Sequence, residues 1–195
     1  MPHTTTKRAL ALSLKKRLKE KPLDKITIKD ICDGCGVNRQ TFYYHFQDIY
    51  DLIEWIYTSA EYQILDENMT LLTWEDALMQ IFDYALQEKE FVIATYHSLS
   101  REHLENFLYR ETYRPLHYII KEHCADISIQ DKDIAFLADF YKYAFVGIVL
   151  EWVRKGMKED PAPLIYKMKL VTESSFNNII DYYVHNLHQH RKVSD

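Results

Sequence analysis

Hydrophobic residues recur every three or four positions along most of this chain, which is the spacing that places them on one face of an α-helix. Leu10, Leu14 and Leu18 form the first such stripe, and the threonine run at positions 4–6 is suited to cap it. Pro22 is expected to stop this helix and to precede a short connector over residues 23–25. Strand-like alternation does not compete with these stripes, so the sequence predicts an all-α protein.

Two short helices separated by a tight turn are predicted next. Thr27 and Asp30 have the spacing of a capping box, which predicts the start of a second helix. Gly36 is expected to end that helix, because a left-handed backbone costs glycine least. Asn38 is a suitable cap for a third helix over residues 39–46. Two helices joined by a short turn that contains glycine are typical of a helix-turn-helix.

The rest of the chain is also predicted to be helical. A fourth helix over residues 49–65 has no break and is expected to join the N-terminal head to a larger body. Further stripes begin at Trp74 and Phe91, and Pro115 is expected to kink or divide the segment that contains it. Residues 131–155 are predicted to form the longest helix, with a glycine after it and an Asp-Pro pair that begins the last helix.

The helix predicted over residues 131–155 is hydrophobic on two sides. One side contains Tyr141, and the other contains Phe136 and Phe140. Such a helix must be covered on both sides, either within the core of one chain or by a second copy. Together with the last helix, it predicts a four-helix homodimer interface. The candidate interface residues are Phe145, Ile148, Trp152, Ile179, Tyr183 and Leu187.

The charge of the chain is distributed unevenly. Residues 1–50 hold ten Lys and Arg against five Asp and Glu, a balance of +5, whereas the rest holds fourteen against twenty-four, a balance of −10. A basic head favours a polyanion partner, because clustered cations release counterions when they neutralise phosphates. The predicted domains are a helix-turn-helix head, residues 1–48, and a helical regulatory and dimerisation body, residues 49–195.

Several classes of protein are not expected. The chain has only four glycines and contains no Gly-rich phosphate loop, GxSxG or HExxH pattern, so neither an enzyme nor a bound cofactor is predicted. No run of about 18 uncharged apolar residues occurs, and a charged segment follows the N-terminal residues. A cytoplasmic protein without membrane contact is therefore expected.

The stretch over residues 28–46 strongly resembles the DNA-binding signature of the TetR family of transcription regulators. The resemblance rests on the Gly36-Val37 turn, the Thr41-Phe42-Tyr43 triplet and the closing His45-Phe46, which follow in the family's order without a gap. It implies a TetR-like fold, with a three-helix head joined by a continuous helix to a body for effector binding and dimerisation. It also implies a homodimer that binds a palindromic operator in double-stranded DNA.

The resemblance also indicates which residues contact DNA. Hydrophobic side chains such as Phe42 are expected to lock the second and third helices together, which leaves the other face of the third helix for DNA. Arg39 and Gln40 are the candidates for base contacts, because their donors and acceptors match base edges in the major groove. Contacts to sugar and phosphate are implied for the others. The full candidate set is Thr27, Lys29, Asn38, Arg39, Gln40, Thr41, Tyr43, Tyr44 and His45.

The start of the fourth helix departs from the family's pattern. Family members commonly carry a phosphate-binding lysine there, whereas this chain has Gln47, Asp48 and Ile49. DNA affinity is therefore expected to be modest without a partner. Residues 42–55 also resemble the subgroup that regulates dihydroxyacetone-kinase-type operons, in which a kinase-like protein can be the sensor. The body is thus expected to receive either a small-molecule effector or a sensor protein.

Cysteines and histidines suggest further chemistry. Cys32 and Cys35 form a CxxC without a second pair, which favours packing thiols over a zinc site. Asp181, His185 and His188 share one face of a predicted helix and leave a metal-responsive regulator as an alternative, although no metal site is assigned. Aromatic and histidine side chains of the body are candidates for a ligand pocket. They are Tyr96, His97, Tyr113, His117 and Tyr141.

Overall fold

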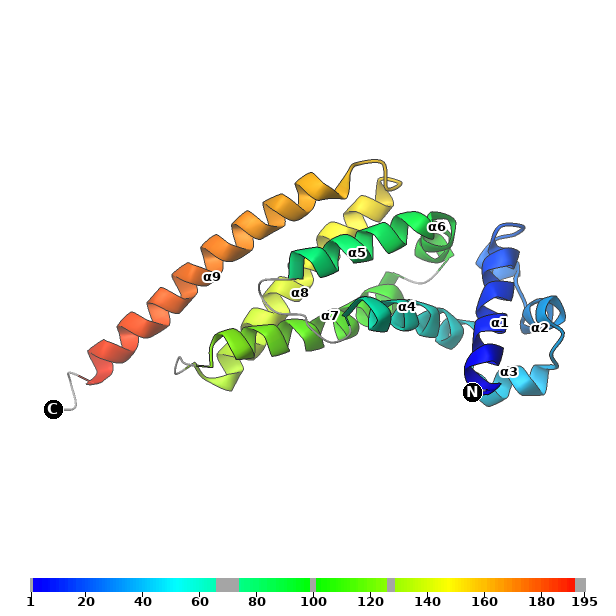
Figure 1. Ribbon diagram of the computed structural model, residues 1–195, viewed down its shortest axis with the longest axis horizontal. Helices are drawn as coiled ribbons and strands as arrows, with labels where there is room; N and C mark the ends of the chain where they lie inside the picture. The colour runs from blue at the N-terminus through cyan, green and yellow to red at the C-terminus, as the bar shows by residue number, and fades with distance from the viewer. Residues whose placement is uncertain (1, 66–73, 99–100, 126–128, 192–195) are drawn as a thin grey trace. The chain divides into compact units, whose positions relative to one another are not determined.

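The structure, a computed structural model, describes the backbone of residues 2–65, 74–98, 101–125 and 129–191, and the side chains of these residues except 2–4, 60–65, 101, 180 and 183–191. Every regular element in these ranges is helical, as the sequence predicts (Figure 1). In chain order the elements are α1 (Pro2–Leu18), the 3-10 turn η1 (Leu23–Lys25), α2 (Ile28–Cys35), α3 (Arg39–His45), α4 (Ile49–Leu65), α5 (Trp74–Gln87), α6 (Lys89–Ser98), α7 (Arg101–His123), α8 (Asp131–Arg154) and α9 (Pro161–Arg191). None of the described helices is long and apolar enough to cross a membrane.

Three features of the helices correct the sequence analysis. The prediction that residues 131–155 form the longest helix is wrong, because α9 spans 31 residues and α8 spans 24. After Pro163 the α9 sequence contains neither glycine nor proline, so nothing stops the helix. Of the kink or division expected at Pro115, the division does not occur: α7 continues through the proline, since hydrophobic positions such as the buried Ile120 extend its packed face beyond it. Helix α1 begins at Pro2, ahead of the expected threonine cap, in a position that proline favours.

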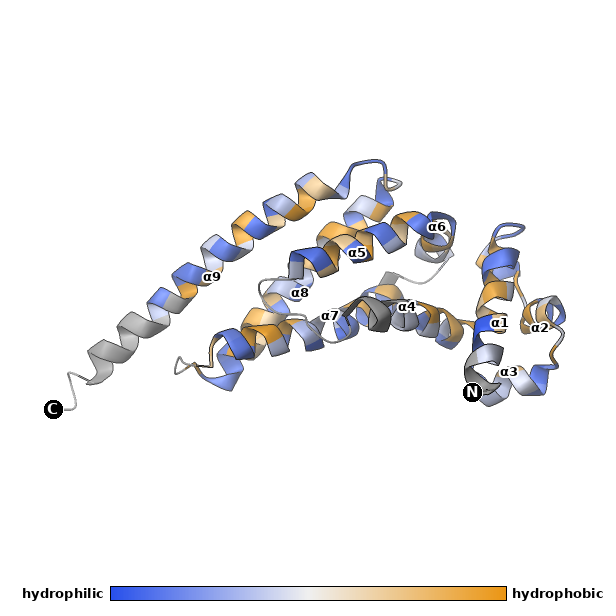
Figure 2. Ribbon diagram, viewed as in Figure 1, coloured by the Kyte–Doolittle hydropathy of each residue, from blue (hydrophilic) through white to orange (hydrophobic). Residues whose placement is uncertain are grey.

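The chain forms two compact units, of which the first comprises Met1–Asp66 and Tyr84–Phe107. It combines the predicted head with α4, α6 and parts of α5 and α7, so its limits differ from the functional boundary expected after residue 48. Figure 2 shows the hydrophobic middle of α1 between hydrophilic segments. This part of α1 packs into a core to which α2, α3, α4 and α6 also contribute. The core includes Leu10, Leu14, Ile31, Phe42, Leu52, Ile53 and Phe91.

Helix α1 also makes charged contacts with the α5–α6 region inside the first unit. Lys15 Nζ lies 2.8 Å from Glu88 Oε1, and Lys19 Nζ lies 3.1 Å from Glu90 Oε2. Lys15 Nζ is also 5.3 Å from the ring centroid of Phe91. Surface ion pairs contribute little energy individually, at most about 1 kcal/mol. Here they mainly help to position α1 against the α5–α6 region, because they add charge complementarity beside the hydrophobic contact of Phe91.

Helices α1 and α2 approach each other closely at Ser13 and Gly34. The buried Ser13 hydroxyl donates a hydrogen bond to the carbonyl oxygen of Ile31 at 2.7 Å. A Cβ atom placed on Gly34 would overlap Ser13 Oγ. Glycine is therefore needed at this position because of the short distance between the helices.

Replacing Gly34 with alanine should lower the free energy of unfolding by about 1 kcal/mol, the order of one buried hydrogen bond, because Ser13 must rotate away from Ile31. Urea unfolding measures the loss. In a Ser13→Ala background the same Gly34→Ala change should cost much less, since the oxygen that it displaces is absent. Equal losses in both backgrounds would contradict the contact.

The second unit comprises Glu67–Asp83 and Leu108–Asp195. One face of α8 fills its core, where α8 side chains pack with Ile120 of α7, with Cys124 directly after α7 and with Phe176 of α9. The core residues of α8 in this cluster are Ile134, Leu137, Ala138 and Tyr141. Lys169 of α9 is paired with Glu75 of α5 at 2.9 Å. Helix α8 is thus the central helix of the described part of this unit.

Candidate nucleic-acid interface

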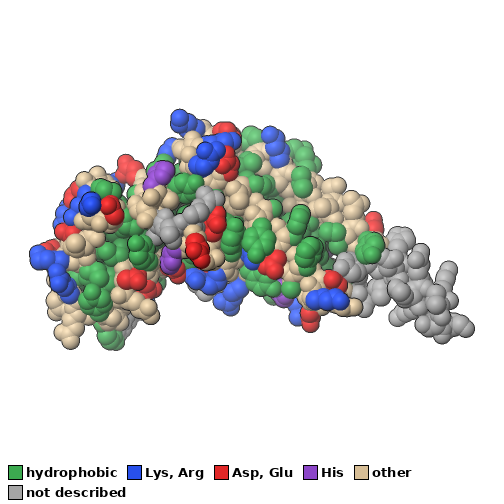
Figure 3. Space-filling view, turned by 180° about the vertical axis from the view of Figure 1, so that it is seen from behind, with side chains coloured by type: hydrophobic (Ala, Val, Ile, Leu, Met, Phe, Trp, Pro, Cys, Tyr) green, Lys and Arg blue, Asp and Glu red, His purple; other side chains and the backbone are tan. Residues whose placement is uncertain are grey.

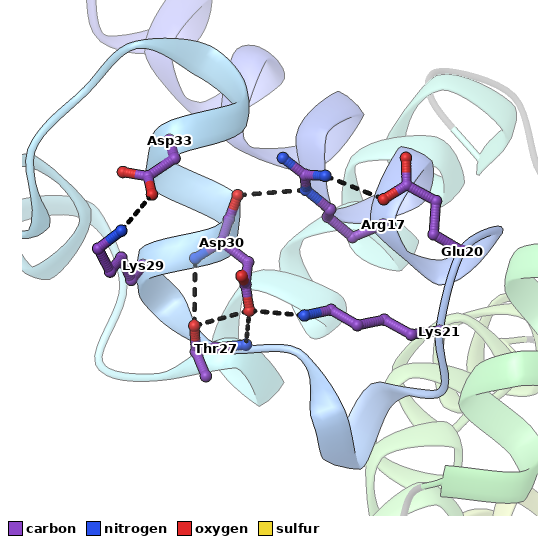
Figure 4. A network of polar contacts seen from close by, with 7 residues as sticks. All are labelled: Arg17, Glu20, Lys21, Thr27, Lys29, Asp30 and Asp33. Atoms are coloured by element: carbon purple, nitrogen blue, oxygen red, sulfur yellow. Dashed lines mark hydrogen bonds and ion pairs between the residues drawn. The ribbon is translucent and has the colours of Figure 1, made fainter.

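The capping box predicted at the start of α2 is present (Figure 4). The Asp30 amide donates to Thr27 Oγ1 at 3.2 Å, and the Thr27 amide donates to Asp30 Oδ2 at 2.8 Å. Lys21 Nζ donates to the same carboxylate oxygen at 2.9 Å. The hydrogen bonds from the Thr27 side chain, the Lys21 ammonium and the Thr27 amide hold the pKa of the Asp30 carboxyl well below its usual range. An ionised Asp30 thus fixes the first turn of α2.

Replacing Asp30 with asparagine should destabilise the protein near neutral pH, and the difference from wild type should shrink in acid. The pKa of this carboxyl is lower in the folded chain than in the unfolded chain. Its contribution is therefore complete above the unfolded value of about 4 and is lost as the pH falls below it. Urea-unfolding midpoints near neutral pH and at about pH 3.5 measure the difference. A difference that grows in acid would contradict this role.

The turn between α2 and α3 sets the direction of the third helix. Gly36 has φ of 70°, in the left-handed region, as the sequence predicts. Asn38 Oδ1 accepts hydrogen bonds from the Thr41 amide at 2.7 Å and from the Thr41 hydroxyl at 3.0 Å. The Cys32 thiol donates to the Asn38 carbonyl oxygen at 3.7 Å. The predicted cap of α3 is therefore confirmed, and it is tied directly to α2.

The cysteines occupy packing positions. Cys32 and Cys124 are buried, Cys35 is half-buried, and all three are free thiols. Burial raises the pKa of each thiol, and a protonated thiol is a poor metal ligand and nucleophile. Among the described residues, no three His, Cys, Asp or Glu side chains lie close enough together to hold a metal ion. The side chains of His185 and His188 lie outside the described residues.

Helix α3 has one buried face and one exposed face. Phe42 is 0% exposed and Phe46, the C-cap residue, is 3% exposed, and both join the core of the first unit. Tyr43 and Tyr44 are 58% and 72% exposed. Of the other predicted contact residues, Thr27, Lys29, Asn38, Arg39 and Gln40 are exposed, and Thr41 and His45 are half-buried. The fold thus brings the predicted set to the surface around one short helix.

Lys7 lies at the junction of α3 and α4, and the sequence analysis did not assign it to DNA. Its Nζ is 5.2 Å from the ring centroid of Phe46 and 5.6 Å from that of Trp55. Ring contacts continue from Phe46 to His45 at 6.3 Å and from His45 to Tyr44 at 5.0 Å. A row of aromatic groups thus connects Lys7 to the exposed face of α3. Its positive charge was visible in the sequence, but its distance from α3 was not.

Two carboxylates cap the start of α4, where members of the TetR family commonly carry a lysine. The Asp51 amide donates to Asp48 Oδ1 at 2.9 Å, and the Gln47 amide donates to Asp51 Oδ2 at 2.9 Å. Negative charge is favourable at a helix N-terminus. These carboxylates therefore stabilise α4, whereas Lys7 places a cation at the same junction.

The five candidate pocket residues are divided between the two units. Tyr96 and His97 belong to the first unit, with ring centroids 5.2 Å apart. Tyr113, His117 and Tyr141 belong to the second, where the rings of Tyr113 and His117 are 5.5 Å apart and Tyr141 is 4% exposed. Tyr113 packs against the core that contains Tyr141. Tyr141 is thus a core residue, and the ligand pocket stays a prediction.

Trp152, a candidate for the dimer interface, is instead buried inside the protomer at 3% exposure. Its ring meets that of Phe82 edge-on at 4.7 Å, and its indole N–H donates to the Glu159 carbonyl oxygen at 2.9 Å. The half-buried Phe145 stacks on Trp74 with ring centroids 5.5 Å apart. Periodicity placed these residues on a hydrophobic face of α8 but could not show that α5 covers it.

The second hydrophobic side that the sequence predicts for α8, the one with Phe136 and Phe140, is exposed in the structure. Phe136, Phe140 and Tyr143 are 68%, 55% and 54% exposed, and we refer to them as the α8 apolar row. Exposed hydrophobic side chains are visible among charged ones in the space-filling view (Figure 3). Of the remaining interface candidates, Ile148 and Ile179 are half-buried, and the side chains of Tyr183 and Leu187 lie outside the described residues.

The capped α2, the glycine turn and the two-faced α3 define a helix-turn-helix DNA-binding protein. Residues 15–56 match the family model described as bacterial regulatory proteins, tetR family. Residues 72–174 match the model described as transcriptional regulator C-terminal region. The chain therefore belongs to the TetR family and is a DNA-binding transcriptional regulator.

Individual proteins resemble this chain in sequence or in fold. The chain is 22% identical over 153 residues to the HTH-type dhaKLM operon transcriptional activator DhaS of Lactococcus lactis subsp. lactis (strain IL1403), an alignment that covers 77% of this chain and 81% of the relative. The fold is similar to a solved structure of the dihydroxyacetone kinase operon activator DhaS, with a TM-score of 0.65, 18% identity and coverage of 91% and 97% of the two chains. NalD, the secondary repressor of the MexAB-OprM multidrug efflux pump in Pseudomonas aeruginosa, has a similar fold, with a TM-score of 0.51, 16% identity and coverage of 91% and 96%.

Proposed function

We propose that this chain controls transcription as a homodimer that places α3 of each protomer in the major groove of a palindromic operator. The observation that carries this proposal is the division of α3 into a buried face with Phe42 and an exposed face with Arg39 and Gln40. Arginine and glutamine can form paired hydrogen bonds with guanine and adenine edges. Two such helices would lie about 34 Å apart, one turn of DNA.

The remaining exposed groups suit the DNA backbone. Tyr43, Tyr44 and His45 are proposed to contact sugar and phosphate from α3, and Thr27 to do so from the start of α2. Asn38 and Thr41 mainly hold the helix start, since they are hydrogen-bonded to each other. Lys29, which is paired with Asp33 at 2.7 Å on the surface, can exchange that carboxylate for phosphate at little cost. Lys7 is proposed as a second phosphate contact.

Binding to the chain's own promoter region tests the proposal. Fluorescence anisotropy with promoter DNA and with random DNA, at two salt concentrations, should show selective binding that weakens as salt rises. Equal affinity for both DNAs would overturn the assignment of Arg39 and Gln40 to bases. A chelator in parallel samples tests the metal-responsive alternative, which requires that DNA binding change when metal is removed.

The α8 apolar row supports the proposed dimer. Replacing Phe140 with glutamate should convert the dimer to a monomer, because a charge would be buried against the partner's hydrophobic surface. Sedimentation or light scattering measures the mass. The matched control is Tyr118→Glu on α7, an aromatic residue that is 60% exposed and should tolerate the charge. A Phe140→Glu protein that stays dimeric would place the interface elsewhere.

A sensor protein is the second candidate for the signal that the body receives. The similarity to an activator of the dhaKLM operon favours this candidate, in which a kinase-like partner docks on the body and DNA affinity without it is weak. Adding the purified product of a neighbouring gene to the anisotropy assay tests it. A large increase in promoter affinity would support the sensor protein. No change, together with tight binding by the chain alone, would support a small-molecule effector.

A further inference from the structure

Three tyrosine rings and a carboxylate enclose a lysine ammonium in the second unit. Lys142 of α8 is 8% exposed. Its Nζ lies 4.4 Å from the ring centroid of Tyr143, 5.3 Å from that of Tyr113 and 5.6 Å from that of Tyr109. It also donates a hydrogen bond to Asp139 Oδ1 at 2.6 Å. We refer to Tyr109, Tyr113, Tyr143 and Asp139 as the tyrosine cage.

The tyrosine cage has the chemistry of a cation site. The faces of aromatic rings attract cations, and the attraction is stronger where water is excluded. Burial alone would lower the pKa of Lys142, but the hydrogen bond and charge of Asp139, together with the Tyr143 side chain, outweigh burial, and the pKa is raised. The ammonium therefore stays protonated. Residues 51–195 have a net charge of −10, which favours the approach of cations to this part of the protein.

The walls of the cage come from two helices and also contact each other directly. Tyr109 and Tyr113 lie one turn apart on α7, Asp139 and Tyr143 lie one turn apart on α8, and the rings of Tyr109 and Tyr143 meet edge-on at 4.9 Å. The ammonium, in contrast, is at the end of a flexible four-carbon stem. Lys142 can therefore leave by rotating about its own bonds while the walls remain.

The cage is also accessible from solvent on one side. Tyr143 is 54% exposed, and the Asp139 side chain is 46% exposed. Because the acceptor oxygen of Asp139 is used by an N–H donor, the best substitute for Lys142 is another ammonium with N–H groups. A quaternary ammonium would satisfy the rings but could not donate to Asp139.

We propose that the tyrosine cage is a binding site for the primary ammonium group of a small organic amine, and that Lys142 occupies the site when no amine is bound. Tyr143 belongs both to the cage and to the α8 apolar row. An amine that displaces Lys142 thus contacts a residue at the proposed dimer surface. An amine that binds one dimer geometry more tightly than another would shift the protein towards that geometry and would thereby control DNA binding. This regulatory consequence rests on the proposed function, whereas amine binding itself does not.

Rescue of a truncated side chain tests the site. Lys142→Ala removes the atoms from Cγ to Nζ, which n-propylammonium can replace. Adding n-propylammonium should raise the thermal unfolding midpoint of Lys142→Ala in a saturable way, by about 2 to 4 °C for each kcal/mol of binding. The wild-type protein should respond much less, because its own ammonium competes. The neutral analogue 1-propanol should have no comparable effect.

Two further variants make the test decisive. Lys142→Met fills the stem space without a charge, so it should fold and should not respond to n-propylammonium. Tyr109→Leu in the Lys142→Ala background should lose the response, because one wall of the cage is gone. Equal shifts in all variants, equal shifts with 1-propanol, or no shift in a folded Lys142→Ala protein would each overturn the proposal. The measurement contains no DNA, so a failure of operator binding does not affect its outcome.

Discussion

Replacing Phe42 with alanine should lower the free energy of unfolding by about 3 to 5 kcal/mol, which makes it the most destabilising change considered. Phe42 is 0% exposed, and its ring packs near Phe46 with centroids 5.9 Å apart in a core that also contains Leu52. The alanine would leave a cavity where α1, α2, α3 and α4 meet. Urea or thermal unfolding measures the loss, and binding to promoter DNA should fail with it.

Tyr43→Ala is the matched control for this change. Tyr43 is adjacent in sequence and aromatic but 58% exposed, so its removal should cost less than about 1 kcal/mol of stability. It should nevertheless weaken DNA binding if it contacts the DNA backbone. A Phe42→Ala protein as stable as wild type would contradict the placement of α3, whereas a Tyr43→Ala protein with full affinity would remove Tyr43 from the interface.

Replacing Arg39 with alanine should reduce affinity for specific DNA by about 1 to 3 kcal/mol, or roughly 5-fold to 150-fold. Arg39 is exposed in the first turn of α3 and carries donors that suit a guanine edge. The loss should be confined to specific DNA, because random DNA lacks the matching base in register. Competition with operators mutated one position at a time should show relaxed preference at a single base pair.

Lys29→Ala and Lys7→Ala provide the comparison for Arg39. Each should weaken specific and random DNA alike and should reduce the salt dependence of binding by about one ion, because a phosphate contact carries no sequence information. If Arg39→Ala and the lysine variants lose the same amount on both kinds of DNA, the division into base and backbone contacts is wrong. A Lys7→Ala protein with unchanged affinity would restrict Lys7 to packing on Phe46 and Trp55.

Local sequence signals predicted the helix-turn-helix well because the interactions that form it are local. The Thr27–Asp30 capping box and the Asn38 cap each span three residues, and the left-handed Gly36 is a property of one residue. The buried Phe42 followed from helical spacing alone. These signals were enough to place α2, the turn and α3 within one residue of their observed limits.

Features that depend on contacts between distant segments were not predictable in the same way. Trp152 was placed at a dimer surface because its face of α8 is hydrophobic, and only the position of Phe82 shows that the protomer itself covers it. Lys7 looked like any other residue on a basic helix face until the fold placed it beside Phe46. The environment of Lys142 was not predictable from sequence, because the tyrosines around it come from two helices.

The contact of α1 with Glu88, Glu90 and Phe91 has a practical meaning for building chimeric regulators. The simplest chimera that exchanges DNA specificity between two family members joins the head of one to the body of the other. In this chain such a junction would separate Lys15 and Lys19 from their carboxylate partners and Phe91 from its core. A functional graft should therefore transfer the whole first unit, residues 1–66 and 84–107, because α4 contributes Leu52 and Ile53 to the same core. Among homologues, charges at positions 15 and 88 are expected to change in concert.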